Sequence, residues 1–256
     1  MKEDVINQFV LWKPIKITSI IIYIVILLVF PFSSFWATII LFGLICFWSR
    51  IPCLISMFTK DLEVLDFFTV MLAIHIGGLF GGLFGAAIML FSRLFGPNEW
   101  YLYTIKDSIC LLVGGLLSPL IFLWTGSALT TLYAFTIIRY VLYMILTILI
   151  EPEFIMLELG LCIAGIGVAF ASNTIIMKFF EAPLASVIEH GVKFNFTLFI
   201  FATLVVGFFY LVSKVTRWLE VRRLKKVEGG LEPEEKPPFW MLDAEAKKMP
   251  RFVKTT

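Results

Sequence analysis

The chain has 256 residues, of which 60% are hydrophobic and only 16% are charged, and its mean hydropathy is +0.95. These values lie far outside the range of soluble domains, so we expect one large membrane domain with the lipid bilayer as its main partner. The formal net charge of +2 gives no basic excess for nucleic acid. Nucleic-acid binding is therefore not expected.

The first part of the chain predicts two short membrane helices. Residues 1–16 mix apolar side chains with charges, which suits either a short helix in the headgroup region or a plain tail. No charge follows until Arg50, and at 1.5 Å per residue this stretch exceeds the hydrocarbon core of roughly 30 Å. We expect helices over about 17–31 and 35–57, with a turn at Pro31. Because a second apolar run follows, the first helix is expected to stay in the membrane rather than be cleaved as a signal peptide.

A glycine repeat lies inside the uncharged stretch from Phe67 to Ser92. Such a run would weaken a helix in water by roughly 1 kcal/mol per glycine, whereas in a bilayer small residues let helices approach to backbone contact. The stretch is predicted to be either one long tilted helix or two short helices hinged at the glycines. The glycines expected to serve helix packing, here and further along the chain, are Gly77, Gly78, Gly81, Gly82, Gly85, Gly114, Gly115 and Gly165.

Four later spans complete a prediction of an all-α, polytopic transmembrane bundle with seven or eight helices. They cover about 106–124, 129–150, 156–177 and 195–215, the last two separated by a polar stretch around Pro183 to Lys193. The expected organisation is an interfacial segment (1–16), a transmembrane domain (17–215) and a basic, then flexible, cytoplasmic tail (216–256). We prefer eight helices, because this count places the cations near Arg50, Arg93 and Lys106, and both chain ends, on the cytoplasmic side of a plasma membrane.

Arg139 is the most informative single residue, because it lies near the middle of a predicted span. A charge there raises the insertion free energy by roughly 2.5–3.5 kcal/mol. One interpretation is a pocket in which the guanidinium binds a carboxylate or phosphate of a solute. The other is a structural ion pair or a snorkelling side chain, with Glu158, Asp107 or Asp66 as partner. Helical spacing places a polar stripe on or beside its face, made of Tyr133, Thr136, Tyr140, Tyr143 and Thr147.

Two further ionisable residues have open interpretations. Glu158 begins a helix with small residues on one face, and it is expected to be either a solvated residue at the helix start or a carboxylate at the mouth of a pocket. His75 is expected to be a hydrogen-bonded packing residue, with pH sensing or proton transfer as the alternative. The four cysteines are widely spaced and have no partner histidines, so we expect buried thiols and no metal or other cofactor.

Enzyme motifs are absent from the sequence. It contains no Gly-x-Ser-x-Gly elbow, no His-Glu-x-x-His pair, no P-loop and no dinucleotide fingerprint. Ser127 follows Gly126 in a short turn, but no histidine lies nearby in the sequence. We therefore expect no catalytic residues.

The stretch from Asp66-Phe67-Phe68 to Phe95-Gly96-Pro97-Asn98, with its glycine-hinged helices, resembles the substrate-capturing S components of energy-coupling-factor transporters and the related MreD-type rod-shape proteins. Gly114-Gly115 and Ser172-Asn173-Thr174 fit the same outline over about 20–190. The resemblance implies substrate binding among the loops, with Arg139 or Trp100 reaching the substrate and an aromatic lid that includes Trp100. The alternative for these aromatic residues is an interfacial belt.

Two functions follow from this reading of the sequence. The first is a small-molecule uptake or substrate-binding membrane component for a small polar or anionic solute, with ligand contacts from Arg139, Tyr140, Tyr143, Thr136, Trp100 and Glu158. The second is a non-catalytic scaffold or subunit that binds other membrane subunits through its glycine stripes, with a basic tail near anionic lipid.

Overall fold

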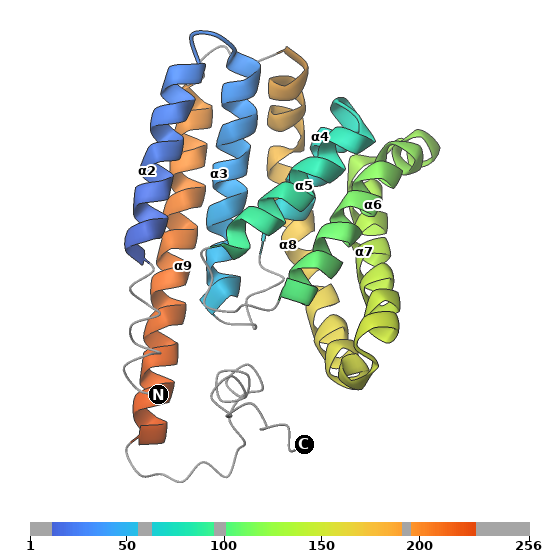
Figure 1. The fold of residues 1–256 in the computed structure, drawn as a ribbon. Helices are drawn as coiled ribbons and strands as arrows, with labels where there is room; N and C mark the ends of the chain where they lie inside the picture. The colour runs from blue at the N-terminus through green and yellow to red at the C-terminus, as the bar shows by residue number, and fades with distance from the viewer. Residues whose placement is uncertain (1–11, 56–62, 95–100, 191–195, 229–256) are drawn as a thin grey trace, which may run out of the picture.

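The computed structural model describes residues 12–55, 63–94, 101–190 and 196–228, which form a bundle of helices without strands (Figure 1). The predicted fold class is confirmed, with eight α-helices in the described part of the chain. Five of them are long and apolar enough to cross a membrane. Their bounds are α2 (Trp12–Val29), α3 (Ser34–Ile55), α4 (Leu65–His75), α5 (Gly78–Arg93), α6 (Tyr101–Thr125), α7 (Ala128–Ile150), α8 (Ile155–His190) and α9 (Phe196–Glu228), with a short 3-10 turn at Pro152–Phe154.

Consecutive helices run in alternating directions, and their ends follow from local sequence signals (Figure 1). Ser33 accepts a hydrogen bond from the backbone N–H of Trp36 at 3.3 Å, which caps the start of α3 after the turn at Pro31. Gly126 adopts a left-handed conformation (φ 63°) that ends α6. Ser127 then accepts a hydrogen bond from the backbone N–H of Thr130 and caps α7.

The glycine-rich stretch forms two short helices, α4 and α5, joined at Gly77. The φ of 147° at this residue favours glycine. With 11 and 16 residues, α4 and α5 are about 16 and 24 Å long, which is less than the roughly 30 Å of the hydrocarbon core. Gly81 lies against Ala73, and Gly85 lies against Thr69, so the two helices form an antiparallel hairpin.

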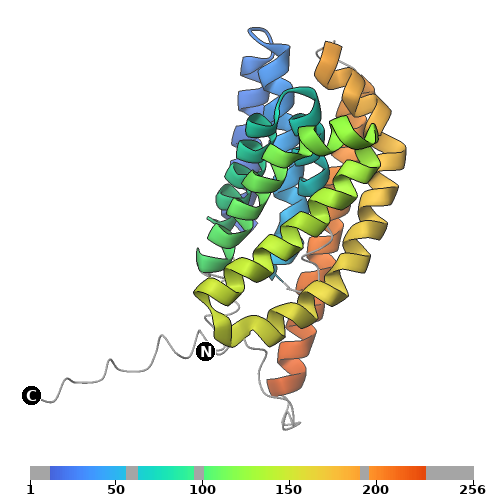
Figure 2. The same cartoon turned by 90° about the vertical axis from the view of Figure 1, so that its right-hand side faces the viewer.

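Three expected boundaries differ from the structure. Residues 12–16, expected in the interfacial segment, already belong to α2. The predicted end of the span near residue 177 is wrong, because α8 continues through Pro183 to His190 (Figure 2). A proline removes one backbone hydrogen bond, but an apolar medium offers no water to satisfy a broken helix, so the helix continues. Residues 216–228, expected to belong to the tail, also lie in a helix because α9 extends to Glu228. Residues 1–11 and 229–256 lie outside the described part of the chain.

The centre of the bundle is α3. In the part of α3 that is long and apolar enough to cross a membrane, 78% of the residues are buried, against 22–33% in the corresponding parts of the other four long helices. The helix packs against α2, α4, α5 and α9, and its large buried side chains include Phe42 and Phe47. The outer faces of the other long helices are apolar, as Leu123, Ile163 and Leu204 illustrate, and this is the surface expected of a bundle surrounded by lipid.

Candidate functional site

Arg139 of α7 lies at the centre of a network of ionisable side chains inside the bundle. Its Nη1 atom contacts Glu63 Oε1 at 2.9 Å and also Asp66 Oδ1. Its Nη2 atom lies 3.3 Å from Asp107 Oδ1 of α6. Three carboxylates from separate positions in the chain therefore surround one guanidinium. Asp107 and Asp66 were two of its three expected partners, whereas Glu63 was not expected.

Arg50 of α3 extends this network. It pairs with Glu63 Oε2, and its Nε atom donates a hydrogen bond to Ser92 Oγ of α5 at 3.1 Å. Glu63 thus bridges two guanidiniums, one on each of its oxygens. We call Arg50, Glu63, Asp66, Asp107 and Arg139 the charged cluster. Because removing one partner of a buried ion pair destabilises a protein by about 3–5 kcal/mol, the cluster ties α3, α4, α6 and α7 together.

The charged cluster lies where α4 begins. Glu63 lies two residues before this short helix, and Asp66 lies in its first turn. Both side chains are buried, so the first turn of α4 lies inside the bundle rather than in solvent. The positive end of a helix dipole stabilises negative charge, which favours carboxylates at this position.

A second polar group surrounds Lys106 of α6, whose side chain is 0% exposed. Its Nζ lies 2.6 Å from Glu151 Oε2 and 3.2 Å from Thr147 Oγ1. The same nitrogen lies 4.5 Å from the ring centroid of Tyr103 and 4.9 Å from that of Tyr143. Two aromatic faces, a hydroxyl and a carboxylate thus enclose the ammonium, in an arrangement typical of cation recognition. We call these five residues the Lys106 cage.

The polar stripe expected on α7 divides into separate contacts. Thr136 is buried and accepts a hydrogen bond from Asn173 Nδ2 of α8 at 3.3 Å. Tyr143 is buried in the Lys106 cage, whereas Tyr140 is half-buried among neighbouring apolar side chains. Tyr133 pairs with Thr174 of α8. The stripe therefore holds α6, α7 and α8 together along its length. Tyr143 and Thr147, toward the end of α7, lie beside the charged side chain of Lys106.

The remaining candidate residues are placed as follows. Glu158 is 1% exposed, so the expectation of a solvated residue at a helix start is wrong: its side chain is buried, whereas Met156 in the same turn is 80% exposed. His75 Nδ1 lies 2.9 Å from Glu189 Oε1, which links α4 to the end of α8. Trp100 lies outside the described part of the chain. All four cysteines are free thiols; three are buried and Cys53 is half-buried.

The glycines bring helix backbones together inside the bundle. A Cβ built on Gly82 would lie 2.6 Å from the backbone oxygen of Leu112, and one on Gly115 would lie 2.5 Å from Gly82 Cα. Gly78 likewise faces Leu116 of α6, and Gly114 faces the ring of Phe135. Gly165 is buried on α8. These contacts bring α6 close to α5, and α6 also carries Lys106 and Asp107.

Sequence reasoning missed Glu63 and interpreted Arg50 and Lys106 only as cations beside loops. The structure buries Arg50 and Lys106 within the bundle. A signal was present, because Lys106 and Asp107 are adjacent and of opposite charge at the start of an apolar span. Pairing opposite charges on neighbouring spans would have pointed to them.

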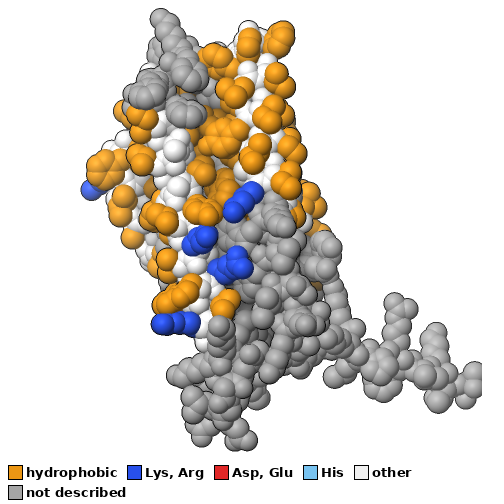
Figure 3. All heavy atoms as spheres, turned by 90° about the vertical axis from the view of Figure 1, so that its left-hand side faces the viewer, with side chains coloured by type: hydrophobic (Ala, Val, Ile, Leu, Met, Phe, Trp, Pro, Cys, Tyr) orange, Lys and Arg blue, Asp and Glu red, His pale blue; other side chains and the backbone are white. Residues whose placement is uncertain are grey.

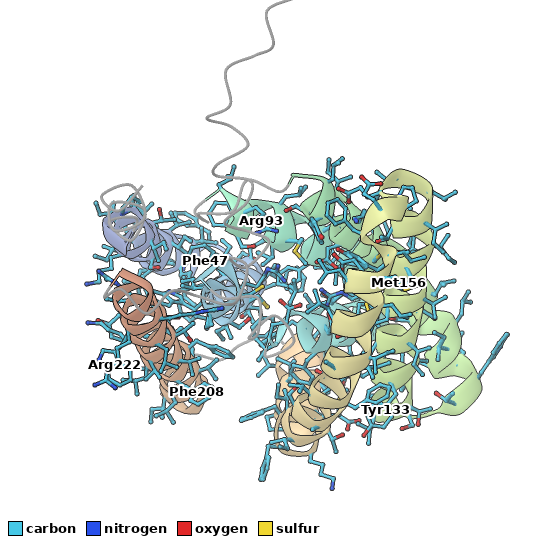
Figure 4. All side chains as sticks on the ribbon, turned by 90° about the horizontal axis from the view of Figure 1, so that it is seen from below. Phe47, Arg93, Tyr133, Met156, Phe208 and Arg222 are labelled. Atoms are coloured by element: carbon cyan, nitrogen blue, oxygen red, sulfur yellow. The ribbon has the colours of Figure 1, made fainter. Side chains whose placement is uncertain are left out.

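Figure 4 shows the end of the bundle near the charged cluster, with Arg93 among the central helices. The Nε atom of Arg93 donates a hydrogen bond to Thr104 Oγ1 at 2.6 Å.

No protein-family model matches the chain, and no similar curated protein or solved structure was found. The resemblance to S components and MreD-type proteins stays an expectation.

Proposed function

We propose that this membrane-embedded bundle is a solute-binding or uptake component for a small polar or anionic solute. The observation that carries the proposal is the charged cluster at the buried start of α4. Ionisable residues inside an apolar bundle are expensive to keep, and they mark solute or ion pathways by default. A purely structural bundle gains little from five such residues, because apolar side chains of similar volume serve stability at least as well.

Arg139 and Asp107 are the residues we assign to solute contact. Of the three carboxylates around Arg139, Asp107 is the most exposed, with 26% of its side chain accessible against 4% for Glu63 and 7% for Asp66. Its contact with Nη2 is also longer, at 3.3 Å, than the 2.9 Å contact of Glu63 with Nη1. A solute carboxylate or phosphate would therefore replace Asp107 on Nη2 while Glu63 and Asp66 keep Nη1 in place.

The resemblance to S components of energy-coupling-factor transporters supports this proposal, since those proteins capture small substrates in a helical membrane domain. On this basis we place the protein in the cytoplasmic membrane of a prokaryote, with its carboxyl terminus in the cytoplasm. The basic residues near the end of α9 support that orientation.

The proposal is tested by identifying small molecules that co-purify with the full chain. The wild-type protein is extracted from native membranes in detergent, denatured, and its released small molecules are measured by mass spectrometry. Arg139→Lys is the informative variant, because it keeps the charge but loses the planar fork that binds carboxylate or phosphate through two hydrogen bonds. Lys178→Gln is the matched control, because it removes an exposed cation on α8 that does not belong to the charged cluster.

We expect one or a few anionic molecules enriched with the wild type and with Lys178→Gln, and strongly reduced with Arg139→Lys. Size-exclusion chromatography establishes that each variant is monodisperse. Equal recovery from wild type and Arg139→Lys, or no enriched molecule from a monodisperse wild type, would contradict the proposal.

A non-catalytic scaffold or subunit is the second candidate function. It is favoured by the saturation of Arg139, whose two terminal nitrogens already contact three carboxylates, as in a structural network. The same purification separates the two functions. A scaffold is expected to bring a stoichiometric membrane subunit through purification and to release no enriched small molecule.

A further inference from the structure

The last helix is longer than a membrane crossing requires. With 33 residues α9 is about 50 Å long, whereas the hydrocarbon core is roughly 30 Å thick. Charge begins only at Lys214, and between Lys214 and Lys226 the sequence holds six Lys or Arg residues against one Glu. The apolar part of α9 therefore crosses the membrane, and its basic part emerges at the headgroup level.

Two cation–aromatic contacts mark that level. Lys214 Nζ lies 5.4 Å from the ring centroid of Tyr210, and Arg222 Cζ lies 4.0 Å from that of Trp218. Tyrosine and tryptophan concentrate at membrane interfaces, where one part of the ring meets lipid and the other meets water. Each aromatic residue precedes its cation by one helical turn and is nearer the membrane. Both cations are thus held back toward the headgroups instead of extending away from them.

Most of the basic side chains lie on the outside of the bundle. We call Lys214, Arg217, Arg222 and Arg223 the basic strip; Lys214, Arg222 and Arg223 are exposed, and so is Trp218, at 52%. Figure 3 shows Lys and Arg side chains in the lower half of one face, below a band of hydrophobic side chains. Arg222 lies at the outer margin of the bundle, across the molecule from Met156 (Figure 4). Tyr210 packs on Trp48 of α3 at 6.0 Å between ring centroids, which fixes α9 against the core.

We propose that the basic strip binds the headgroups of anionic phospholipids in the adjoining leaflet. The charge complementarity is direct, because each basic residue near such a surface contributes about 1 kcal/mol of attraction, or about a five-fold change in affinity. The guanidiniums can also contact phosphate oxygens through two hydrogen bonds. A lipid is favoured over a soluble acidic protein because Trp218 holds Arg222 toward the membrane. This inference is independent of solute binding at Arg139.

The experiment compares an anionic with a zwitterionic lipid on the purified full chain. Detergent-purified protein is titrated with dioleoyl phosphatidylglycerol and, separately, with dioleoyl phosphatidylcholine, and bound lipid is counted by native mass spectrometry. The test variant replaces all four residues of the basic strip by glutamine. A charge-conserving variant carries Arg217→Lys, Arg222→Lys and Arg223→Lys. Lys178→Gln, an exposed cation on α8, is the matched control.

We expect wild type, the charge-conserving variant and Lys178→Gln to prefer phosphatidylglycerol. The preference should fall by more than about twenty-five-fold in the glutamine variant. Each lost charge should lower the affinity for the anionic lipid about five-fold, so the loss of four charges should exceed that value. Salt of about 1 M, where the Debye length is about 3 Å, should weaken it, and millimolar inorganic phosphate should not compete. Equal binding of both lipids by wild type, or an unchanged preference in the glutamine variant, would overturn the inference. So would competition by inorganic phosphate, which would indicate a site for the free ion.

Discussion

Replacing Gly82 by alanine tests the contact between α5 and α6 with a single added methyl group. A Cβ at this position would lie 2.6 Å from the backbone oxygen of Leu112 and 3.1 Å from its Cα. Ordinary contact begins at 3.4 Å, so the two backbones must separate by about 0.8 Å. Backbone atoms cannot rotate aside as the end of a side chain can. The two helices must therefore move apart as units, together with the charged residues on α6.

The expected magnitude follows from the size of this overlap. Overpacking a close-packed interior destabilises it by about 1–3 kcal/mol. Alanine also has a better helix propensity than glycine, which raises the stability of any glycine-to-alanine variant in a helix. Gly207→Ala is the reference variant, because it has the same gain in propensity but its Cβ would meet nothing within 4 Å. Relative to Gly207→Ala, we expect Gly82→Ala to lose about 1–3 kcal/mol of stability. For a chain of this size, that loss lowers the melting temperature by about 2–12 °C.

The assay is thermal unfolding of the purified variants in one detergent, followed by intrinsic tryptophan fluorescence. Gly115→Ala is expected to behave like Gly82→Ala, because its Cβ would lie 2.5 Å from Gly82 Cα on the other side of the same contact. Equal melting temperatures for Gly82→Ala and Gly207→Ala would refute the reasoning, because they would show that α5 and α6 are not in backbone contact at this level.

Three further predictions concern the charged cluster, the Lys106 cage and the hinge. Arg139→Gln is expected to lower the free energy of unfolding by about 3–5 kcal/mol, because it leaves buried carboxylates without this cation. Asp107→Asn should lower it by about 1 kcal/mol or less, because Asp107 is partly exposed. Equal losses for the two variants in denaturant unfolding would contradict this prediction. Lys106→Met should be less stable than Lys106→Met combined with Glu151→Gln, because the single change strands a buried carboxylate, and a double-mutant cycle measures the difference. Gly77→Ala should lower the free energy of unfolding by about 1–3 kcal/mol through backbone strain alone, because the φ of this residue is 147° and the added Cβ would meet nothing within 4 Å. Thermal unfolding measures this loss, and a melting temperature equal to that of wild type would count against a strained hinge.

Arg139 illustrates how far sequence reasoning reaches at the candidate site. Its position near the middle of an otherwise uncharged span left three interpretations open, a bound solute anion, an ion pair or a snorkelling side chain, because an isolated charge at that depth is costly. Asp66 and Asp107 could be named as partners because they begin neighbouring spans. Glu63 could not be identified in this way, since it lies in a short connection and its burial depends on how α3 and α4 pack around it. Arg50 and Lys106 were interpreted as loop cations for the same reason.

The sequence by itself determined that the chain is a bundle of apolar helices suited to a lipid bilayer. Each uncharged span is long enough to cross the bilayer, and a helix satisfies all its backbone hydrogen bonds where no water is present. The sequence could not determine whether α8 passes through Pro183 or whether the glycine stretch is one helix or two, since both depend on neighbouring helices. Only the tertiary structure decided which charges meet: an ion pair forms only where its nitrogen and oxygen atoms lie within about 4 Å, and residues such as Glu63 and Arg139 are far apart along the chain.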